Sequence, residues 1–390
     1  MTFIILLIVA ITAIALFIPG VAHRPVWRAT VTPLASIIGS GFLVLGPVLI
    51  HDFGVFAPLV MLLLCVLAWG FGAAIRANIR RIGEWPAPDS QAERIGGWML
   101  TVAYMISVAY YLNLLGSFAV SLTPWNTEFS GRAVTTSVYV FLLALGVWRG
   151  FSALEAVEYP AVVIKLAVIA ALVFALAGFT WDAASAGGLL TPPQQIHGWS
   201  AVTLIFGLLI TVQGFEISRY MGTSYPAAQR VRSMKLAQLV AAVIYVLYVA
   251  LLTASVQVEK GGVSETEIIS LMAQVSPLLP LLMVGAALAA QFSAGVADTG
   301  GAGGLLEEVS RKMFSERQGY IVVVIVGLVL TWVADVFTII AIASRAFALY
   351  YAVQCYIAAH HAEGHRRLAF GVMGVIGLSA ALLGTSVEGA

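Results

Sequence analysis

Twelve long apolar runs, joined by short polar loops, restrict what this sequence can fold into. Charged residues make up 10% and hydrophobic residues 61% of the 390 residues, whereas soluble proteins have about 25% and about 45–50%. About 20 apolar residues suffice to cross a bilayer as a helix. We therefore expect an all-α polytopic membrane protein with about twelve transmembrane helices. The runs cover residues 3–21, 30–50, 55–75, 97–121, 133–148, 157–179, 199–221, 234–256, 278–306, 319–334, 336–358 and 368–387.

The same composition argues against several classes of function. A net charge of +1 provides no basic face for nucleic acid, so we expect no nucleic-acid partner. HExxH, Walker, GxGxxG and GxSxG motifs do not occur in a context that supports enzyme chemistry. We therefore expect no enzyme, no cofactor and no metal site, and the lipid bilayer is the first predicted partner.

Basic residues in the loops predict the orientation. One set of alternate loops holds sixteen Lys and Arg residues and the opposite set holds two. Loops rich in Lys and Arg remain in the cytoplasm. The first run has no basic residue before it and is followed by Arg24 and Arg28, so it is predicted to be a retained helix rather than a cleaved signal peptide. We expect a multi-pass protein of the inner (plasma) membrane with both termini outside the cytoplasm.

The second run contains the segment Ile38-Gly39-Ser40-Gly41-Phe42. Each glycine weakens a helix by roughly 1 kcal/mol relative to alanine. An opening here would free the backbone N–H groups of the half-helix that follows, and such a terminus binds a carboxylate. The alternative interpretation is close helix packing through small residues.

A matching interruption, Gln213-Gly214-Phe215-Glu216, occurs in the seventh run. Interrupted helices at corresponding positions in two halves indicate the midplane site of a transporter. Runs two to six and seven to eleven then form two five-helix units, and the loop charges require these units to be inverted. The predicted division is an extra helix at 1–27, the two repeats at 28–180 and 181–358, and a C-terminal helix at 359–390.

Ionisable side chains inside apolar runs indicate function, because their burial is costly. Lys165 lies in the sixth run and Asp298 in the ninth. If the two are adjacent, they form either a proton-exchanging pair or a fixed structural ion pair. Gly295, Asp298 and Thr299 share one helical face, and their oxygens suit a hard cation such as sodium.

Arg345 is the other basic residue inside an apolar run, the eleventh. Arginine stays protonated in proteins, so it cannot carry protons through a transport cycle. We expect its guanidinium to bind a carboxylate within the ion-coupling region, either Glu216 or Asp298, or to extend towards the cytoplasm.

These segments resemble the amino acid–polyamine–organocation (APC) superfamily of transporters with the LeuT-type fold. Ile38-Gly39-Ser40-Gly41-Phe42 resembles the glycine motif of its first core helix, and Gly214-Phe215-Glu216 resembles its broken sixth core helix. Ile164-Lys165-Leu166-Ala167-Val168-Ile169 resembles the fifth core helix of the branch in which a lysine occupies the position of a coupling sodium. The resemblance implies that the first motif binds a substrate carboxylate and the second an amine.

The sequence also departs from that family. Ser218 to Pro226 replaces the acidic-Asn-Pro segment usual after the broken sixth core helix, and Asp298 and Arg345 are not typical of an amino acid permease. An extra run precedes the core and one run follows it. These differences concern the substrate more than the fold.

We therefore expect a secondary transporter that moves a small zwitterionic solute, an amino acid, by alternating access with proton coupling through Lys165 and Asp298. One alternative keeps the fold and couples transport to sodium through Gly295, Asp298 and Thr299. Another is a transporter-like sensor or membrane subunit that needs a partner protein. The oligomeric state stays open.

Overall fold

The computed structural model describes residues 2–39, 41–83, 90–149, 155–222, 224–258 and 264–387. Every regular element in these ranges is a helix, so the predicted all-α class is confirmed. The elements are α1 Thr2–Phe17, α2 Pro19–Ala22, α3 Pro25–Ile37, α4 Gly41–Phe53, the 3₁₀ turn η1 Gly54–Phe56, α5 Ala57–Ile82, α6 Gln91–Val120, α7 Glu128–Arg149, α8 Glu155–Ser185, α9 Gly198–Gly207, the 3₁₀ turn η3 Leu209–Val212, α10 Ile217–Tyr220, α11 Ala227–Ser255, α12 Glu267–Val275, α13 Leu279–Val309, α14 Glu316–Val333, α15 Val336–His360 and α16 Gly364–Leu383.

Each of the twelve predicted apolar runs contains helix. In the described part of the chain, nine helical stretches are long and apolar enough to cross a membrane, and one of them joins α4 to α5 across η1. The first run falls short because α1 has only 16 residues. The second and seventh runs are divided into shorter helices. The predicted count of twelve crossings and the inverted repeat therefore stay predictions.

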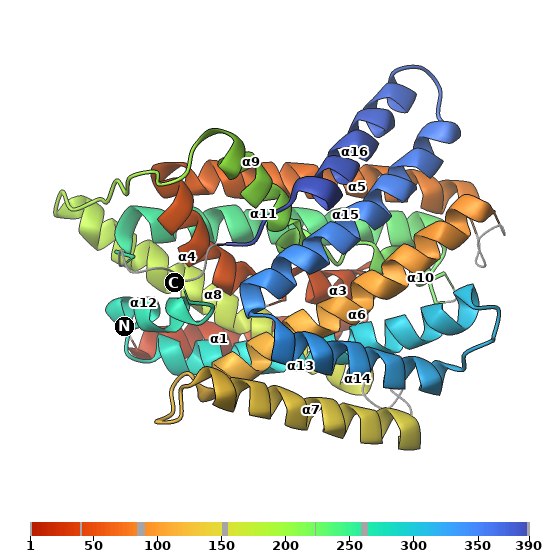
Figure 1. Ribbon diagram of the computed structural model, residues 1–390. Coiled ribbons are helices and arrows are strands. Elements are labelled where there is room, and N and C mark those ends of the chain that lie inside the picture. Colours follow the sequence, from red (N-terminus) through yellow and green to blue (C-terminus); the bar gives the residue numbers. More distant parts are fainter. Residues whose placement is uncertain are drawn as a thin grey trace.

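The long helices run roughly side by side, and the marked chain ends lie at the same end of the bundle (Figure 1). The connections from α13 to α14 and from α15 to α16 lie at the other end. The C-terminal end of α5, with Arg80 and Arg81, belongs to that second end, which we call the basic end.

Two long helices, α6 and α13, pack against each other in opposite directions. Ser107 of α6 donates a hydrogen bond to Asp298 of α13. A Cβ added at Gly301 would lie 3.3 Å from the ring of Tyr104. The backbone of α13 therefore lies close to α6 at this glycine, which has no side chain. Small residues allow such contact between helices in membranes. Close packing against a neighbouring helix thus accounts for Gly301, whereas a Cβ added at Gly304 would meet no atom within 4 Å.

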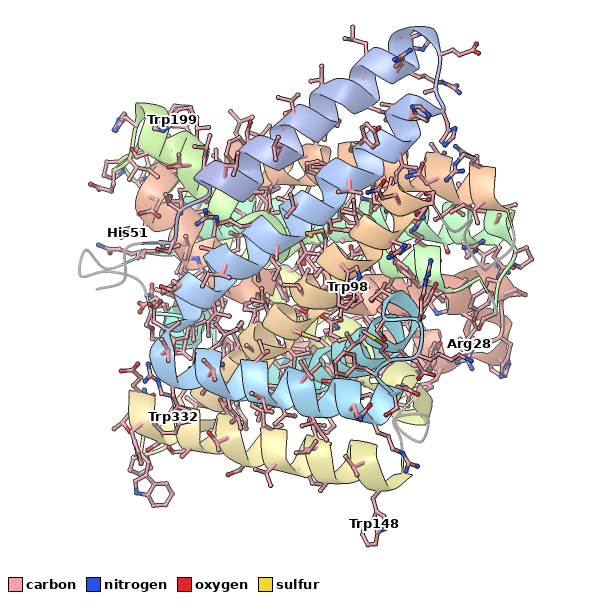
Figure 2. The ribbon with its side chains drawn as sticks, turned by 45° about the vertical axis from the view of Figure 1, so that its right-hand side comes forward. Arg28, His51, Trp98, Trp148, Trp199 and Trp332 are labelled. Carbon is pink, nitrogen blue, oxygen red and sulfur yellow. The ribbon has the colours of Figure 1, made fainter. Side chains whose placement is uncertain are left out.

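Large apolar and aromatic side chains cover the outside of the bundle. Trp125, Trp148 and Trp199 are exposed by 72%, 85% and 64%. Trp148 and Trp199 project from opposite sides of the molecule (Figure 2). An apolar outer surface with tryptophan near the helix ends is typical of a protein surrounded by lipid.

The sequence did not predict α12, the short helix between α11 and α13. Its buried residues are Ile268, Ile269, Leu271 and Met272, and it packs against α13 and α4. Nine residues are too few to cross a bilayer. The helix therefore covers the end of the bundle that lies opposite the basic end.

Candidate functional site

The second apolar run is interrupted where the glycines predicted it. The first half, α3, ends at Ile37, and the second half, α4, begins at Gly41. Ile38 leaves the helical conformation with a ψ of 58°. Ser40, one of the predicted substrate-binding residues, lies outside the described residues. Since a helix end leaves backbone groups without intrahelical partners, this break presents peptide groups inside the bundle.

The seventh run is interrupted over a longer segment. After α9 and η3, Gln213 is extended, with a ψ of −179°, and Gly214 has a φ of +111°. Glycine adopts a positive φ such as this at little cost, whereas the backbone of other residues is strained in this conformation. The chain then turns into the single-turn helix α10. Gln213 and Phe215 are buried, so this irregular backbone lies within the protein.

The two interruptions are in direct contact. A Cβ added at Gly214 would lie 2.5 Å from the Oγ of Ser36 and 2.6 Å from the backbone N of Ile37. A Cβ at Gly41 would lie 2.5 Å from the Oη of Tyr110 and 3.4 Å from the Cα of Thr211. Both breaks thus come together around glycines that leave no room for a side chain.

Two tyrosines of α6, which sequence reasoning missed, border the meeting point. Tyr111 receives a hydrogen bond of 2.9 Å from the Nε2 of Gln213. Its ring would lie 3.2 Å from a Cβ at Gly39. Tyr110 lies beside Gly41. No local pattern identifies these residues, because tyrosines within a long apolar helix do not show which neighbours they contact.

Glu216 is fully buried and stabilises the second break from within. Its Oε2 accepts hydrogen bonds from the backbone N of Gly214 at 3.0 Å and from the Oη of Tyr351 at 2.9 Å. Phe215 stacks on the ring of Tyr351, with the ring centroids 5.2 Å apart. The segment predicted to bind an amine is therefore held against α15 by a carboxylate and an aromatic stack.

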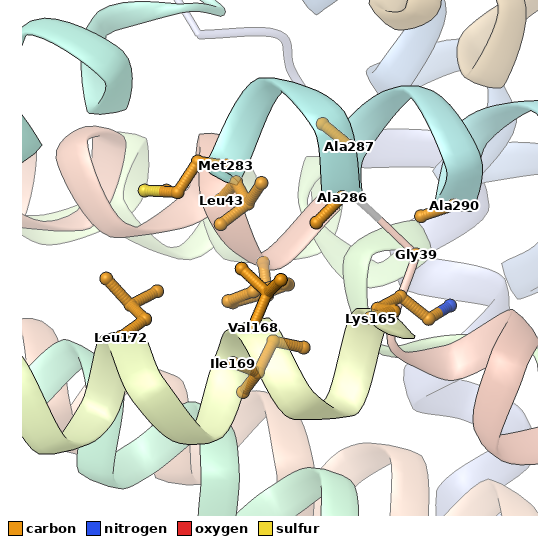
Figure 3. A pocket seen from close by; sticks show the side chains of 11 residues that line it. Gly39, Leu43, Lys165, Val168, Ile169, Leu172, Met283, Ala286, Ala287 and Ala290 are labelled. Atoms are coloured by element: carbon orange, nitrogen blue, oxygen red, sulfur yellow. The ribbon is translucent and has the colours of Figure 1, made fainter. Parts of the chain in front are cut away.

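Lys165 lies beside the first break. Its Nζ donates a hydrogen bond of 2.8 Å to the backbone O of Ala35, near the C-terminal end of α3. The side chain is 2% exposed. With Gly39, Phe42 and Ala290 it lines a small apolar cavity between α4, α8 and α13 (Figure 3). The ammonium thus occupies a position next to helix-end carbonyls, where a cation is electrostatically favoured.

Asp298 has a different neighbourhood from the one that we predicted. Its carboxylate accepts a hydrogen bond from Ser107 of α6 and makes no ion pair with Lys165. Asp298 lies eight residues along α13 from Ala290, or about 12 Å at 1.5 Å per residue. The predicted direct contact between the two ionisable groups is therefore wrong, because the carboxylate faces α6.

The oxygens proposed for sodium also have partners within the chain. The Oγ1 of Thr299 donates a hydrogen bond of 2.6 Å to the carbonyl O of Gly295. A threonine hydroxyl commonly bonds the carbonyl four residues earlier. We predicted that oxygens of Gly295, Asp298 and Thr299 share a cation. In the structure, the oxygens of Gly295 and Thr299 are joined by a hydrogen bond.

Arg345 does not bind a carboxylate in the ion-coupling region, so that prediction is wrong. The side chain is exposed, and its Nε donates to the backbone O of Ala381 at 2.8 Å. A second guanidinium nitrogen donates to the O of Leu382 at 3.3 Å. These carbonyls form the C-terminal end of α16, where a positive charge is favourable.

A cavity of about 910 Å³ extends into the protein beside α13. Arg28, Glu308 and Glu316 line it near the basic end, and Tyr104 and Asp298 line it deeper in the bundle. Ile217 and Tyr220 of α10 form part of its wall. The cavity therefore connects the basic end with residues that adjoin the second break.

Charged residues at the basic end hold α10 in place. Glu93, in the first turn of α6, accepts hydrogen bonds from Arg219 of α10 and, at 2.9 Å, from Arg81 of α5. Arg230 donates to the backbone O of Arg219 at 2.8 Å and to that of Gly83 at 2.6 Å. Because both carboxylate oxygens of Glu93 are used, one residue joins three helices.

Two interrupted helices that meet inside an apolar bundle, together with a deep cavity from one end, define a multi-pass membrane protein of the transporter class. Residues 19–384 match a family described as APC superfamily transporter. The chain therefore belongs to the APC superfamily of transporters, as the resemblance of its motifs predicted.

One relative in sequence and one similar solved structure are further matches of the chain. An uncharacterised protein of Aquifex aeolicus (strain VF5) is 40% identical over 350 residues, which cover 87% of this chain and 85% of the relative. The fold is similar to that of MHP1, a nucleobase-cation-symport-1 family transporter solved in a closed conformation with bromovinylhydantoin bound. That match has a TM-score of 0.57 at 15% identity and covers 91% of this chain and 90% of MHP1. The predicted LeuT-type fold is confirmed.

Proposed function

We propose that this chain is a secondary active transporter that moves a small zwitterionic solute, an amino acid, by alternating access. The observation that carries the proposal is the direct contact between the two helix breaks. Gly214 packs on the Ser36–Ile37 end of α3, and peptide groups of both breaks face the interior of the bundle. Exposed peptide groups at a midplane site bind small charged solutes in transporters of this architecture.

The two breaks offer complementary chemistry to a zwitterion. The N-terminal end of α4, beginning at Gly41, carries partial positive charge and suits a carboxylate. The second break contributes acceptors, including the carboxylate of Glu216 and the side-chain oxygen of Gln213. An amine that approaches Gln213 and Glu216 would be stabilised by these oxygens.

The position of Lys165 supports proton coupling. The ammonium of Lys165 already donates to the Ala35 carbonyl beside the first break. The Thr299 hydroxyl donates to the Gly295 carbonyl, and both oxygens keep lone pairs, so sodium coupling through Gly295, Asp298 and Thr299 is the alternative that the uptake experiment tests. In the proposed cycle Lys165 gives up and regains a proton, which breaks and remakes its bond to α3. Asp298, bound to Ser107 at the side of the large cavity, provides a second proton site.

The deep cavity supports an inward-facing state. It is lined at one end by Arg28 and Glu316, which lie at the basic end of the bundle. Since basic loops remain in the cytoplasm, this cavity would be the path of solute release, with both termini outside the cytoplasm. The protein would be located in the inner (plasma) membrane.

Uptake into proteoliposomes tests the proposal. We expect labelled amino acids to accumulate when the lumen is alkaline and the outside acidic, without sodium. Lys165→Ala should abolish the dependence of uptake on the pH gradient, with solute binding retained. Lys235→Ala, which removes an exposed lysine from α11, is the matched control. Uptake that requires sodium, or that keeps its pH dependence in Lys165→Ala, would refute the coupling mechanism.

A further inference from the structure

Gln291 of α13 stands out among the buried amides of the chain. It is fully buried, and within the described residues neither its Nε2 nor its Oε1 has a hydrogen-bond partner. By contrast, the side chain of Gln238 bonds Arg76 and the backbone of Ala68, and that of Gln354 accepts from Asn78. Buried amides normally have partners, because an unpaired one loses its hydration without compensation.

The register between α6 and α13 locates Gln291 close to the two breaks. It precedes Asp298 by seven residues, which is about two helical turns, so the two side chains share a face. Asp298 faces Ser107 of α6, and Gly295 lies against Leu112. As the two helices run in opposite directions, the same register places Gln291 opposite residues 114–116 of α6, about one turn beyond Tyr111.

Neighbouring positions on α13 confirm this location. Ala290 lines the small cavity together with Gly39 of the first break, and Figure 3 shows the two beside Lys165. Ala289 and Phe292 line the large cavity that extends from the basic end. The helical turn that carries Gln291 therefore lies between the two cavities, next to residues that line each of them.

A second amide near the same place is only half satisfied. Gln213 donates through Nε2 to Tyr111, while its Oε1 has no hydrogen-bond partner in the described part of the chain. The unmet groups are thus the NH₂ group of Gln291, with its two N–H donors, and two carbonyl acceptors, from Gln291 and Gln213. Gln213 reaches α6 at Tyr111, and Gln291 lies about one turn of α6 further along.

The chemistry of Gln291 restricts what can satisfy it. A carboxamide presents a donor and an acceptor side by side, and its complement presents an acceptor and a donor in the same plane. A carboxylate offers only acceptors and an ammonium offers only donors, so each leaves one atom of Gln291 unpaired. A carboxamide, lactam or cyclic ureide satisfies both, and a second N–H of the same group can reach Gln213.

We propose that Gln291 is a substrate-binding residue and that the transported solute carries a planar amide-type group, which Gln291 binds through two hydrogen bonds. This inference rests on the proposed transport function and makes its substrate class more specific. An amino acid side chain and a cyclic ureide both supply this group, because they share the same hydrogen-bonding edge.

Thermal shifts of the purified full chain in detergent test the inference, because a bound ligand raises the melting temperature. The probes are glutamine and dihydrouracil, which carry the amide edge, and glutamate and putrescine, which do not. We expect either glutamine or dihydrouracil to raise the melting temperature. The probe that does so shows whether an amino acid side chain or a cyclic ureide supplies the amide group. Gln291→Met should weaken its binding about tenfold or more, because two hydrogen bonds are lost.

Two further variants separate binding from structure. Gln291→Glu replaces the donor with an acceptor, so it should also abolish binding of the amide probe, whereas an ammonium ligand would bind this variant more tightly. Without ligand, Gln291→Met should melt no lower than the original protein, since no hydrogen bond within the chain is lost. Gln274→Glu, an exposed change on α12, is the control and should leave binding unchanged.

The inference is overturned if neither amide probe binds, if Gln291→Glu binds the amide probe as tightly as the original protein, or if Gln291→Met lowers the melting temperature without ligand. Its failure differs from failure of the proposed function. Uptake of amino acids that lack an amide, unchanged in the Gln291 variants, would leave transport in place and refute this inference. If the proteoliposomes take up no solute at all, the proposed function itself fails.

Discussion

The two helix breaks satisfy their free peptide groups in different ways. At the first break, side chains of other helices bind the carbonyls of α3, with Lys165 on Ala35 and Tyr245 on Ile37. At the second break, Glu216 binds the backbone of its own segment at Gly214. An oxygen of Gln213 and one of Glu216 are left without a partner within the described residues.

This difference assigns separate tasks to the two breaks in the proposed mechanism. The first break already holds a cation, so a change in the charge of Lys165 acts directly on the position of α3. The second break holds unmet acceptors, so a solute that donates hydrogen bonds contributes most there. Coupling would then depend on the first break and solute selection on the second, although the two are in contact.

The largest expected effect comes from removing the glycine at which the breaks touch. Gly214→Ala places a Cβ 2.5 Å from Ser36 and 2.6 Å from Ile37, at a φ of +111°. Steric overlap and backbone strain together should cost about 2–5 kcal/mol. We expect a large fall in melting temperature and loss of transport, measured by thermal unfolding and uptake.

Gly285→Ala is the matched control for this change. Gly285 lies in α13, and a Cβ added there would meet no atom within 4 Å. Alanine also favours the helix by roughly 1 kcal/mol relative to glycine. The control should therefore unfold at the same temperature or higher. Equal melting temperatures for the two variants would show that the breaks are not in contact.

An intermediate effect is expected at the support of the second break. Tyr351→Phe removes the hydroxyl that donates to buried Glu216 at 2.9 Å. Losing the partner of a buried polar group typically costs about 1–3 kcal/mol. Tyr350→Phe is the control, because the hydroxyl of Tyr350 lies at 3.3 Å from the neutral hydroxyl of Tyr220 rather than at a carboxylate. We expect Tyr351→Phe to lower the melting temperature more and to weaken solute binding. If the two variants behave alike, Glu216 does not depend on Tyr351.

The helix breaks were predictable from sequence because glycine acts locally. Gly39 and Gly41 weaken the helix wherever their neighbours pack, and Gly214 permits a conformation that strains other residues. Both interruptions therefore occur where the sequence predicted them. The apolar length of the other runs likewise determined the helical class.

The partners of the site residues were not predictable, because they depend on contacts between distant helices. Lys165 and Asp298 were expected to pair, as both are ionisable and lie within apolar runs. In the structure, Asp298 instead accepts a hydrogen bond from the hydroxyl of Ser107 in α6. This partner was not predictable because the sequence does not show which face of α6 packs against α13. Tyr111 and Tyr351 were missed for the same reason.

Arg345 provides the smallest predicted effect and tests whether coupling is restricted to the first break. Its guanidinium binds the end of α16 through Ala381 and Leu382, and the side chain is exposed. Arg345→Ala should therefore cost about 0.3–1 kcal/mol, the usual contribution of a charge at a helix end. The pH dependence of uptake should stay unchanged, in contrast to Lys165→Ala. A shift in that pH dependence would mean that this arginine acts on the coupling groups from outside the site, and the division of tasks between the breaks would then be wrong.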